Sequence, residues 1–265
     1  MKKITIACFL PLLLFGSGCA VSAEGAKERE REDGVRTIRI VNWNVQTFFD
    51  ANADGCEYAE FKSPKSKWGR DEYTARLGRL CGAIKNLNAD VYVFEEIENE
   101  GVMYDIANML AGGARDAKNW SYVCFAKAHG DALGCAVLSR WPLHAMTVHT
   151  LDIRTHAKQP RMRPVICVSV LQGSRSLTLC VNHWKSKLGG EKESALWRSW
   201  QESVLARLLL ETNGSAAVAC GDFNRDIGEF SKGGEGDAVV LYGAGFGTVS
   251  EALVKSPWLS ENACG

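Results

Sequence analysis

Apolar residues recur along part of this chain at the spacing of a helix that is buried on one face. The clearest set is Tyr73, Leu77, Leu80, Ile84 and Leu87. Steps of three and four residues bring side chains to one side of a helix, so the pattern predicts an amphipathic helix over about residues 70–87. Residues 102–110 and 193–211 are predicted to form two further helices.

Elsewhere the apolar residues form short runs, which are typical of buried strands. The predicted strands cover residues 37–44, 91–94, 121–125, 135–139, 143–151, 165–171, 177–181 and 216–220. Gln172-Gly173-Ser174-Arg175 is expected to form a hairpin turn. Helices alternate with strands at first, and hairpins, a helix and another strand follow. This order predicts an α+β fold, a two-sheet β-sandwich flanked by helices.

Four of the predicted strands end in polar side chains that are able to do chemistry. The endings are Asn42 and Asn44, Glu95 and Glu96, Asn182 and His183, and Asp222 and Asn224. One such ending alone is explained by a plain turn, because Asp and Asn favour turns. Four of them indicate strand ends that converge on a single catalytic pocket.

The same endings carry a resemblance to a known family. The segments are Asn42-Trp43-Asn44-Val45, Phe94-Glu95-Glu96-Ile97-Glu98-Asn99, Gly134-Cys135-Ala136-Val137-Leu138-Ser139-Arg140-Trp141-Pro142, Asn182-His183-Trp184-Lys185-Ser186-Lys187 and Gly221-Asp222-Phe223-Asn224. In this order, over roughly residues 37–224, they resemble the successive motifs of the endonuclease/exonuclease/phosphatase superfamily. The segment that begins at Asn182 most resembles secreted bacterial nucleases. The resemblance implies a four-layer, deoxyribonuclease-like sandwich and the hydrolysis of phosphodiesters, most closely those of DNA or RNA.

The resemblance also implies a divalent cation. Phosphodiester cleavage needs charge neutralisation on the phosphoryl oxygens, which Mg²⁺ held by carboxylates supplies, with Mn²⁺ as the alternative. Glu96 is the metal ligand by resemblance, and Asn44 is the other residue of the family's metal site. The residues themselves leave Glu95 and Glu96 open, because neighbouring strand positions face opposite ways.

Roles for the other site residues follow from the same resemblance. His183 would stabilise the transition state or protonate the leaving group, Asp222 would orient the nucleophile, and Asn224 would grip the phosphate. Asn182 and Lys185 are expected to contact the substrate. Arg140 is a further candidate for substrate binding, with a structural ion pair as the alternative.

Composition restricts how a nucleic acid would be held. Lys+Arg and Asp+Glu are both 31, so the chain has no overall basic field. Contacts with nucleic acid would be local and salt-sensitive, around Lys185, Lys187, Lys192 and Arg198. The length of 265 residues suits one large domain, which we expect to be a monomer with no stable membrane span.

The ten cysteines do not change the predicted function. They form no Cys-x-x-Cys or Cys-x-x-His cluster, which argues against zinc. Four of them lie in apolar strands and are interpreted as small hydrophobic residues: Cys135, Cys167, Cys180 and Cys220. Cys56 and Cys264 are loop candidates for pairing, but the sequence specifies no bridge.

The first residues predict export. Met1, Lys2 and Lys3 precede an apolar run over residues 4–15, which indicates an export signal rather than a membrane span. Cleavage after Ala23 would give a soluble exported protein. A lipoprotein box ending at Cys19 is the alternative. The expected organisation is a signal peptide at 1–23, a charged tether at 24–36 and the family domain at 37–265.

Two further features bear on activity. The loop over residues 50–67 is long for a connector and is expected to face the substrate. Family members end in a Ser-Asp-His segment that activates the nucleophile, whereas no histidine follows His183 here. We therefore expect the last strand or strands to be missing and the activity to be impaired. The alternative functions are a phospholipid or inositol-phosphate phosphodiesterase or phosphatase, or an inactive surface protein on the same scaffold.

Overall fold

The computed structural model describes residues 5–7, 37–112, 120–151, 159–212, 216–225 and 247–248. The tether at 24–36, Cys19, and Cys264 lie outside these residues. The helices are α1 (Ala59–Lys62), α2 (Arg70–Leu87), α3 (Glu100–Ala111) and α4 (Glu191–Leu210). The strands are β1 (Thr5–Ala7), β2 (Ile40–Phe48), β3 (Val91–Ile97), β4 (Tyr122–Ala126), β5 (Gly134–Ser139), β6 (Leu143–His149), β7 (Val165–Gln172), β8 (Arg175–His183), β9 (Ala216–Asp222) and β10 (Gly247–Thr248).

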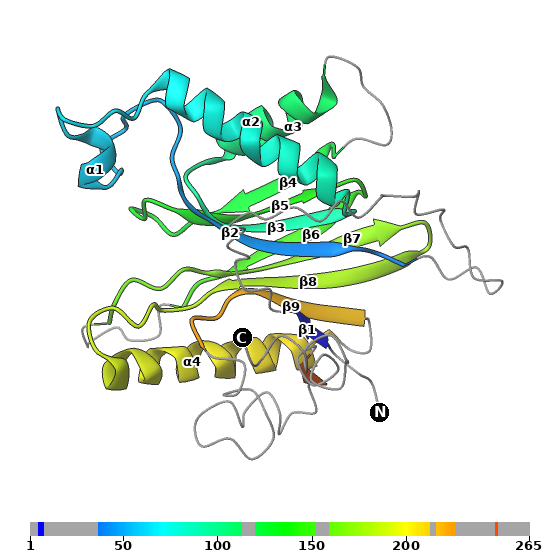
Figure 1. Ribbon diagram of the computed structural model, residues 1–265. Helices are drawn as coiled ribbons and strands as arrows, with labels where there is room; N and C mark the ends of the chain where they lie inside the picture. The colour runs from blue at the N-terminus through cyan, green and yellow to red at the C-terminus, as the bar shows by residue number, and fades with distance from the viewer. Residues whose placement is uncertain are drawn as a thin grey trace, which may run out of the picture.

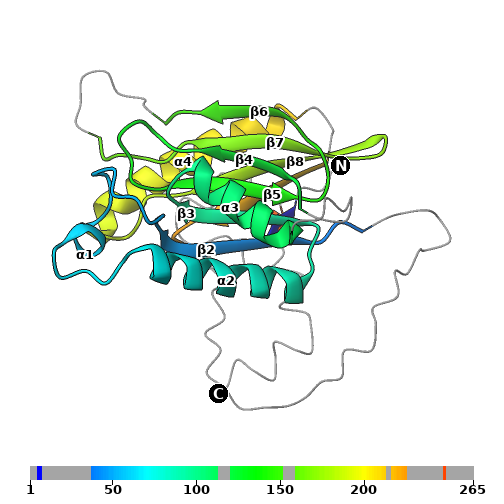
Figure 2. The ribbon, with the colours of Figure 1, turned by 90° about the horizontal axis from the view of Figure 1, so that it is seen from above.

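The strands form two sheets that lie face to face between layers of helices. One sheet has the order β2-β3-β5-β4 and the other the order β10-β1-β9-β8-β7-β6. The helices α2 and α3 cover the outer face of the first sheet, and α4 covers the outer face of the second (Figure 1). Seen from above, α3 lies over β4 and β5, and α2 runs alongside β2 (Figure 2). The predicted four-layer α+β sandwich is therefore confirmed.

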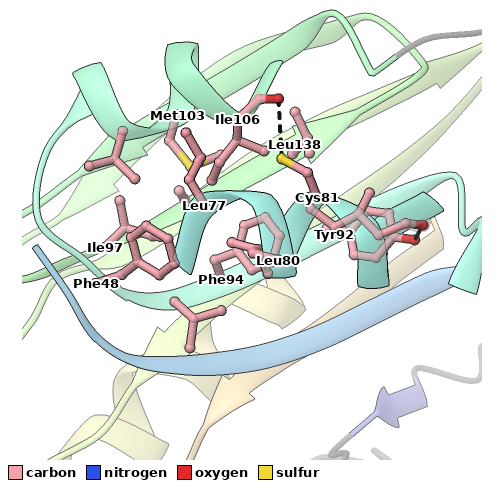
Figure 3. Packing of buried hydrophobic residues seen from close by; sticks show 14 of the residues in the cluster. Phe48, Leu77, Leu80, Cys81, Tyr92, Phe94, Ile97, Met103, Ile106 and Leu138 are labelled. Atoms are coloured by element: carbon pink, nitrogen blue, oxygen red, sulfur yellow. Dashed lines mark hydrogen bonds between the residues drawn. The ribbon is translucent and has the colours of Figure 1, made fainter. Parts of the chain in front are cut away.

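Alternation along the strands divides the apolar side chains between the layers. In β3, Val91 and Val93 face the second sheet and pack with residues of β7 and β8. The intervening Tyr92 and Phe94 face α2 and α3, where they pack with residues such as Leu80 (Figure 3). A strand buried on both faces reads as a continuous apolar run, which is why residues 91–94 are apolar without interruption.

The three long helices are those that the sequence predicts, with small changes at their ends. Helix α2 has the predicted bounds, and its buried side chains include Tyr73, Leu77, Leu80 and Ile84. Leu87 differs from the prediction because it is 51% exposed. It is the last residue of the helix, and Asn88 follows in the left-handed conformation with φ of 49°, so the chain turns away before Leu87 reaches the sheet.

Strand pairing brings distant parts of the chain together on the two sides of β9. Strand β9 pairs in parallel with β8 on one side and with β1 on the other, where Thr5 lies opposite Val218. Strand β1, which pairs with β9, thus belongs to the segment that the sequence predicts to be an export signal. The predicted turn at residues 172–175 is confirmed, since Gln172 pairs with Arg175. No helix among the described residues is both long and apolar enough to span a bilayer.

Candidate active site

The ends of four strands meet at one edge of the sandwich. Strands β2 and β3 run parallel in one sheet, and β8 and β9 run parallel in the other. The chain leaves β2 toward α1 and leaves β8 toward α4 at the same end of the molecule (Figure 1). Asn44 of β2 donates a hydrogen bond from Nδ2 to Asp222 Oδ2 of β9 at 3.0 Å, which joins the two sheets at this edge.

A β-bulge decides which of the two neighbouring glutamates faces this edge. The pairing of β3 with β5 shifts between Glu95 and Ile97, and Glu96 between them has φ of 66°. An extra residue at a bulge turns its side chain out of the regular alternation. Glu96 consequently points toward Asn44, and its Oε2 accepts a hydrogen bond from Thr47 N at 2.7 Å.

Glu95 lies in the interior instead. Its side chain is fully buried, and Oε2 accepts a hydrogen bond of 3.4 Å from Asn42 Nδ2. Burial, followed by the negative charge of Asp222, raises the pKa of Glu95 well above 4.5 and favours the neutral acid. The two glutamates that the sequence could not separate therefore have different surroundings: Glu95 is buried, and Glu96 faces Asn44 at the strand ends.

Four side chains make up what we call the sheet-end cluster: Asn44, Glu96, His183 and Asp222. The Nδ2 atom of Asn44 donates to Glu96 Oε1 at 3.2 Å and to Asp222 Oδ2 at 3.0 Å. His183 Nε2 lies 4.0 Å from the same Glu96 oxygen and 3.8 Å from the same Asp222 oxygen. Residues separated by up to 178 positions in the sequence thus surround one small volume. The predicted convergence of the strand ends is confirmed as geometry, while the role of each residue stays a prediction.

His183 is held as a neutral imidazole. Burial, followed by the positive charge of Arg163, lowers its pKa to about 3, although Asp222 acts in the opposite direction. Its Nδ1 is buried and has no hydrogen-bond partner among the described residues. A proton on Nε2 would face the carboxylates of Glu96 and Asp222, so the electrostatics favour the Nε2–H tautomer. His183 is therefore able to donate a hydrogen bond at the cluster without carrying a charge.

The close approach of β9 to β8 requires the glycine at position 221. Gly221 has φ of 139°, and a Cβ at this position would lie 1.8 Å from Asn182 O. The close approach brings Asp222 directly opposite His183 in the strand register. Asn224 follows with φ of 49°, donating from its backbone N to Asp222 Oδ1 at 2.9 Å and from Nδ2 to Trp184 O at 3.1 Å. The other Nδ2 proton of Asn224 has no acceptor among the described residues.

Two of the expected substrate contacts lie elsewhere. Asn182 is fully buried, accepts a hydrogen bond from Trp184 Nε1 at 3.1 Å and donates to Cys180 O at 2.8 Å. It points to the opposite side of β8 from His183, because successive strand residues alternate. Arg140 follows β5 and lies near the start of β3, where Nη1 is 3.9 Å from Asp90 Oδ1. For Arg140, the structure supports the alternative prediction, which is a structural ion pair.

The expected basic residues divide between the interior and a pocket. Arg198 is only 1% exposed and forms an ion pair with Glu191 at 2.5 Å, so it adds nothing to a basic surface. Lys185 donates from Nζ to Leu188 O at 3.1 Å and lines a pocket of about 340 Å³. Arg161 and Arg163 line the same pocket.

Arg163 is the residue near the cluster that the sequence analysis missed. Its charge acts on both His183 and Cys135, and no hydrogen bond or ion pair joins it to the described residues. The predicted site residues all follow strands, whereas Arg163 precedes its strand. Because β7 runs antiparallel to β8, the start of β7 lies beside the end of β8. The signal was the two arginines, Arg161 and Arg163, shortly before the predicted strand at 165–171.

The cluster has the donors that a hard divalent cation takes. Glu96 and Asp222 offer carboxylate oxygens at the surface, their side chains being 19% and 31% exposed. Neither forms an ion pair with a lysine or arginine of the described residues, and the neutral imidazole of His183 does not offset their charges. The residues present therefore fit such an ion, with Asn44 holding the two carboxylates in place.

Comparison with known proteins supports the fold. Residues 39–234 match the Endonuclease/Exonuclease/phosphatase family. No curated protein sequence matches the chain. Among solved structures, TDP2 from Caenorhabditis elegans is 16% identical with a TM-score of 0.50, covering 75% of this chain and 50% of that chain. The chain thus spans about half the length of that protein.

Two other solved structures are similar. SmcL is 15% identical with a TM-score of 0.53, covering 78% of this chain and 68% of that chain. Sphingomyelinase C from Streptomyces griseocarneus is 17% identical with a TM-score of 0.50, covering 80% and 70%. Likeness at these identities establishes a shared fold and leaves the substrate open.

Proposed function

Because the chain belongs to the endonuclease/exonuclease/phosphatase family, we propose that it is an exported, metal-dependent phosphodiester hydrolase that cleaves nucleic acid. The observation that carries the proposal is the sheet-end cluster, in which two carboxylates, an amide and a neutral histidine surround one volume. A pocket lined by Arg161, Arg163 and Lys185 suits the phosphates of a polyanionic strand.

The two surface carboxylates of the cluster would hold the cation. Glu96 and Asp222 are the ligands, and Asn44 orients both through its Nδ2 hydrogen bonds. A bound Mg²⁺ or Mn²⁺ supplies neutralisation of charge on the phosphoryl oxygens. The second, fully buried glutamate, Glu95, takes no part because its carboxyl group does not reach the surface.

His183 and Asp222 perform the polar steps of the proposed reaction. Neutral His183 donates its Nε2 proton in a hydrogen bond to a phosphoryl oxygen, and such a donor is most effective where water is excluded. Its exposure of 3% meets that condition. Asp222 accepts a hydrogen bond from the attacking water, while the nearby positive charge of Arg163 stabilises the growing negative charge of the phosphate.

A phospholipid is the second candidate substrate. The protein from Streptomyces griseocarneus is a sphingomyelinase C by name, and its fold is similar. In this chain Leu188 is 83% exposed on the loop that carries Lys185 and Ser186, both of which line the pocket. An exposed apolar side chain at the rim of a polar pocket suits the surface of a lipid bilayer.

Plasmid cleavage tests the proposed activity. Wild-type chain with Mg²⁺ or Mn²⁺ is expected to nick DNA and to stop when EDTA is added. The substitution His183→Ala should lower the rate by about 10²-fold or more. His144→Ala is the matched control, since His144 is exposed on β6 and belongs to no cluster. Equal rates for wild type and His183→Ala would contradict the assignment of the sheet-end cluster as the active site. The absence of metal-dependent cleavage of DNA, RNA and sphingomyelin would contradict the proposal that the chain is a phosphodiester hydrolase.

Export is tested separately, by the N-terminus of the mature chain. Full-length protein expressed in a bacterial host should be recovered outside the cytoplasm with Glu24 as its first residue. A chain that starts at Cys19 and carries lipid would favour the lipoprotein alternative. Recovery of intact chain from the cytoplasm alone would contradict both.

A further inference from the structure

The loop that leaves β2 has oxygen-bearing side chains at alternate positions. Asp50, Asn52 and Asp54 are each separated by one alanine, and Gly55 follows in the left-handed region with φ of 96°. Calcium-binding loops place ligands at positions one, three and five and a glycine at position six. Their bidentate glutamate at position twelve is absent, because Phe61 stands there.

A glutamate from another element comes to this loop. Glu98 follows the end of β3 and is 1% exposed. Its Oε2 accepts a hydrogen bond from Asp50 N at 2.5 Å. One oxygen from each of Asp54, Glu57 and Glu98 lies within 4.8 Å of the others. Three carboxylates, two of them buried, therefore gather where the loop meets the strand.

The second carboxylate oxygen of Glu98 is unpartnered. Glu98 Oε1 is buried without a hydrogen-bond partner among the described residues. Lys62 donates from Nζ to the neighbouring Gly55 O at 2.8 Å, and no lysine or arginine of the described residues forms an ion pair with the three carboxylates. Burying a carboxylate oxygen without a partner, beside two like charges, is costly, and a bound cation would offset that cost.

The remaining contacts leave room for an ion. Glu57 accepts backbone hydrogen bonds at both oxygens, from Asp54 N at 2.5 Å and Gly55 N at 2.9 Å. Asp54 Oδ1 accepts from Cys56 N at 2.8 Å. Each carboxylate oxygen has a further lone pair, and these backbone contacts only fix its direction.

We propose that Asp54, Glu57 and Glu98, with the loop that begins at Asp50, form a calcium site that is separate from the sheet-end cluster. The two sites share no residue. The donors are oxygen atoms alone, which suits Ca²⁺ better than zinc or copper, and the flexible number of ligands suits Ca²⁺ better than Mg²⁺. Glu98 supplies the carboxylate that a glutamate at position twelve supplies in other calcium-binding loops.

The site ties the loop to the strand that carries Glu96. Asn99 donates from Nδ2 to Asp50 Oδ2 at 3.0 Å and caps α3 by accepting from Val102 N at 3.1 Å. The cation thus fixes the start of the loop, the end of β3 and the start of α3 in one arrangement. Calcium binding is consequently expected to order the loop that leads away from the cluster.

Terbium luminescence and calcium titration of the full chain test the site. Trp68 donates from Nε1 to Asp50 O at 2.7 Å and is close enough to sensitise bound Tb³⁺. The Asp222→Asn chain, in which the sheet-end cluster is weakened, should still bind one Tb³⁺ that Ca²⁺ displaces and a large excess of Mg²⁺ does not. Glu98→Gln should weaken binding by about tenfold or more, and so should Asp54→Asn, which changes an exposed residue.

Glu60→Gln is the matched control. Glu60 is an exposed glutamate of α1, a few residues along the same loop, and lies outside the three-carboxylate group. Its substitution should leave the affinity unchanged. Equal affinity in wild type, Glu98→Gln and Asp54→Asn would overturn the proposal, as would the absence of bound Tb³⁺. Because binding is measured without a substrate, the result does not depend on the proposed nuclease activity.

Discussion

Replacing Glu96 by glutamine should remove metal-dependent cleavage, whereas the same change at Glu95, one residue earlier, should leave the rate unchanged. The bulge turns the Glu96 carboxylate toward Asn44, at 3.2 Å, and leaves Glu95 fully buried. At an effective dielectric constant of about 20, two unit charges about 4 Å apart interact by about 4 kcal/mol. Each 1.4 kcal/mol is about tenfold in a rate or binding constant, so loss of the Glu96 charge should cost at least about 10²-fold.

Glutamine at position 95 closely matches the shape and the neutral charge of the protonated Glu95 side chain. Burial raises the pKa of Glu95, so the folded chain binds a proton that the unfolded chain has lost above its own pKa of about 4.5. The stability of wild type should therefore fall as the pH rises through and above this value, and Glu95→Gln should lose that dependence. At neutral pH the variant should be at least as stable as wild type.

The assay compares initial rates of plasmid nicking against Mg²⁺ concentration for wild type, Glu95→Gln and Glu96→Gln, with Tm measured for each. The expected result is a large loss in Glu96→Gln alone, with Tm close to that of wild type. A loss of activity in Glu95→Gln at unchanged Tm, together with full activity in Glu96→Gln, would refute the assignment from the bulge.

Three other changes test other parts of the structure. Gly221→Ala should lower Tm by about 5 °C or more, because its Cβ would meet Asn182 O at 1.8 Å and φ is 139°; a thermal unfolding curve measures this. Arg163→Ala should raise KM for DNA by about tenfold or more with a smaller effect on kcat, and Arg163→Lys should recover part of the loss, as steady-state kinetics would show. Cys167 and Cys180 face each other across β7 and β8 with Sγ atoms 3.0 Å apart, so oxidised glutathione should link them, and thiol labelling followed by mass spectrometry should find two fewer free thiols.

The hydrophobic pattern was sufficient to predict the layers because the layers follow from burial. The uninterrupted run at residues 91–94 must lie between two covered faces, and the helical spacing over residues 70–87 must supply one of the covers. The apolar runs placed Asn44, His183 and Asp222 at strand ends, and the parallel pairs β2–β3 and β8–β9 bring those ends together. These features depend on local composition and on the direction of neighbouring strands.

The features that the sequence could not predict depend on register. Glu95 and Glu96 differ by a single shift in pairing between β3 and β5, which no local pattern records. Arg140 and Arg163 both flank strands, and only the directions of β5 and β7 decide that Arg140 lies near the start of β3 while Arg163 lies near His183. The same applies to Asn182, which alternation turns to the face opposite His183.

The site also depends on a helix that carries none of the family motifs. Gln46 and Thr47 have φ of 57° and 43°, just after Asn44, and such residues cost about 1–3 kcal/mol each. Arg76 of α2 offsets this cost: it donates to Val45 O at 2.9 Å, to Thr47 O at 3.1 Å and to Gln46 O, while its guanidinium lies 4.8 Å from the centre of the Phe48 ring. Thr47 N can then donate to Glu96 Oε2 at 2.7 Å. The packing of α2 on the first sheet is therefore a condition for the orientation of Glu96, so the core and the candidate active site are parts of one arrangement.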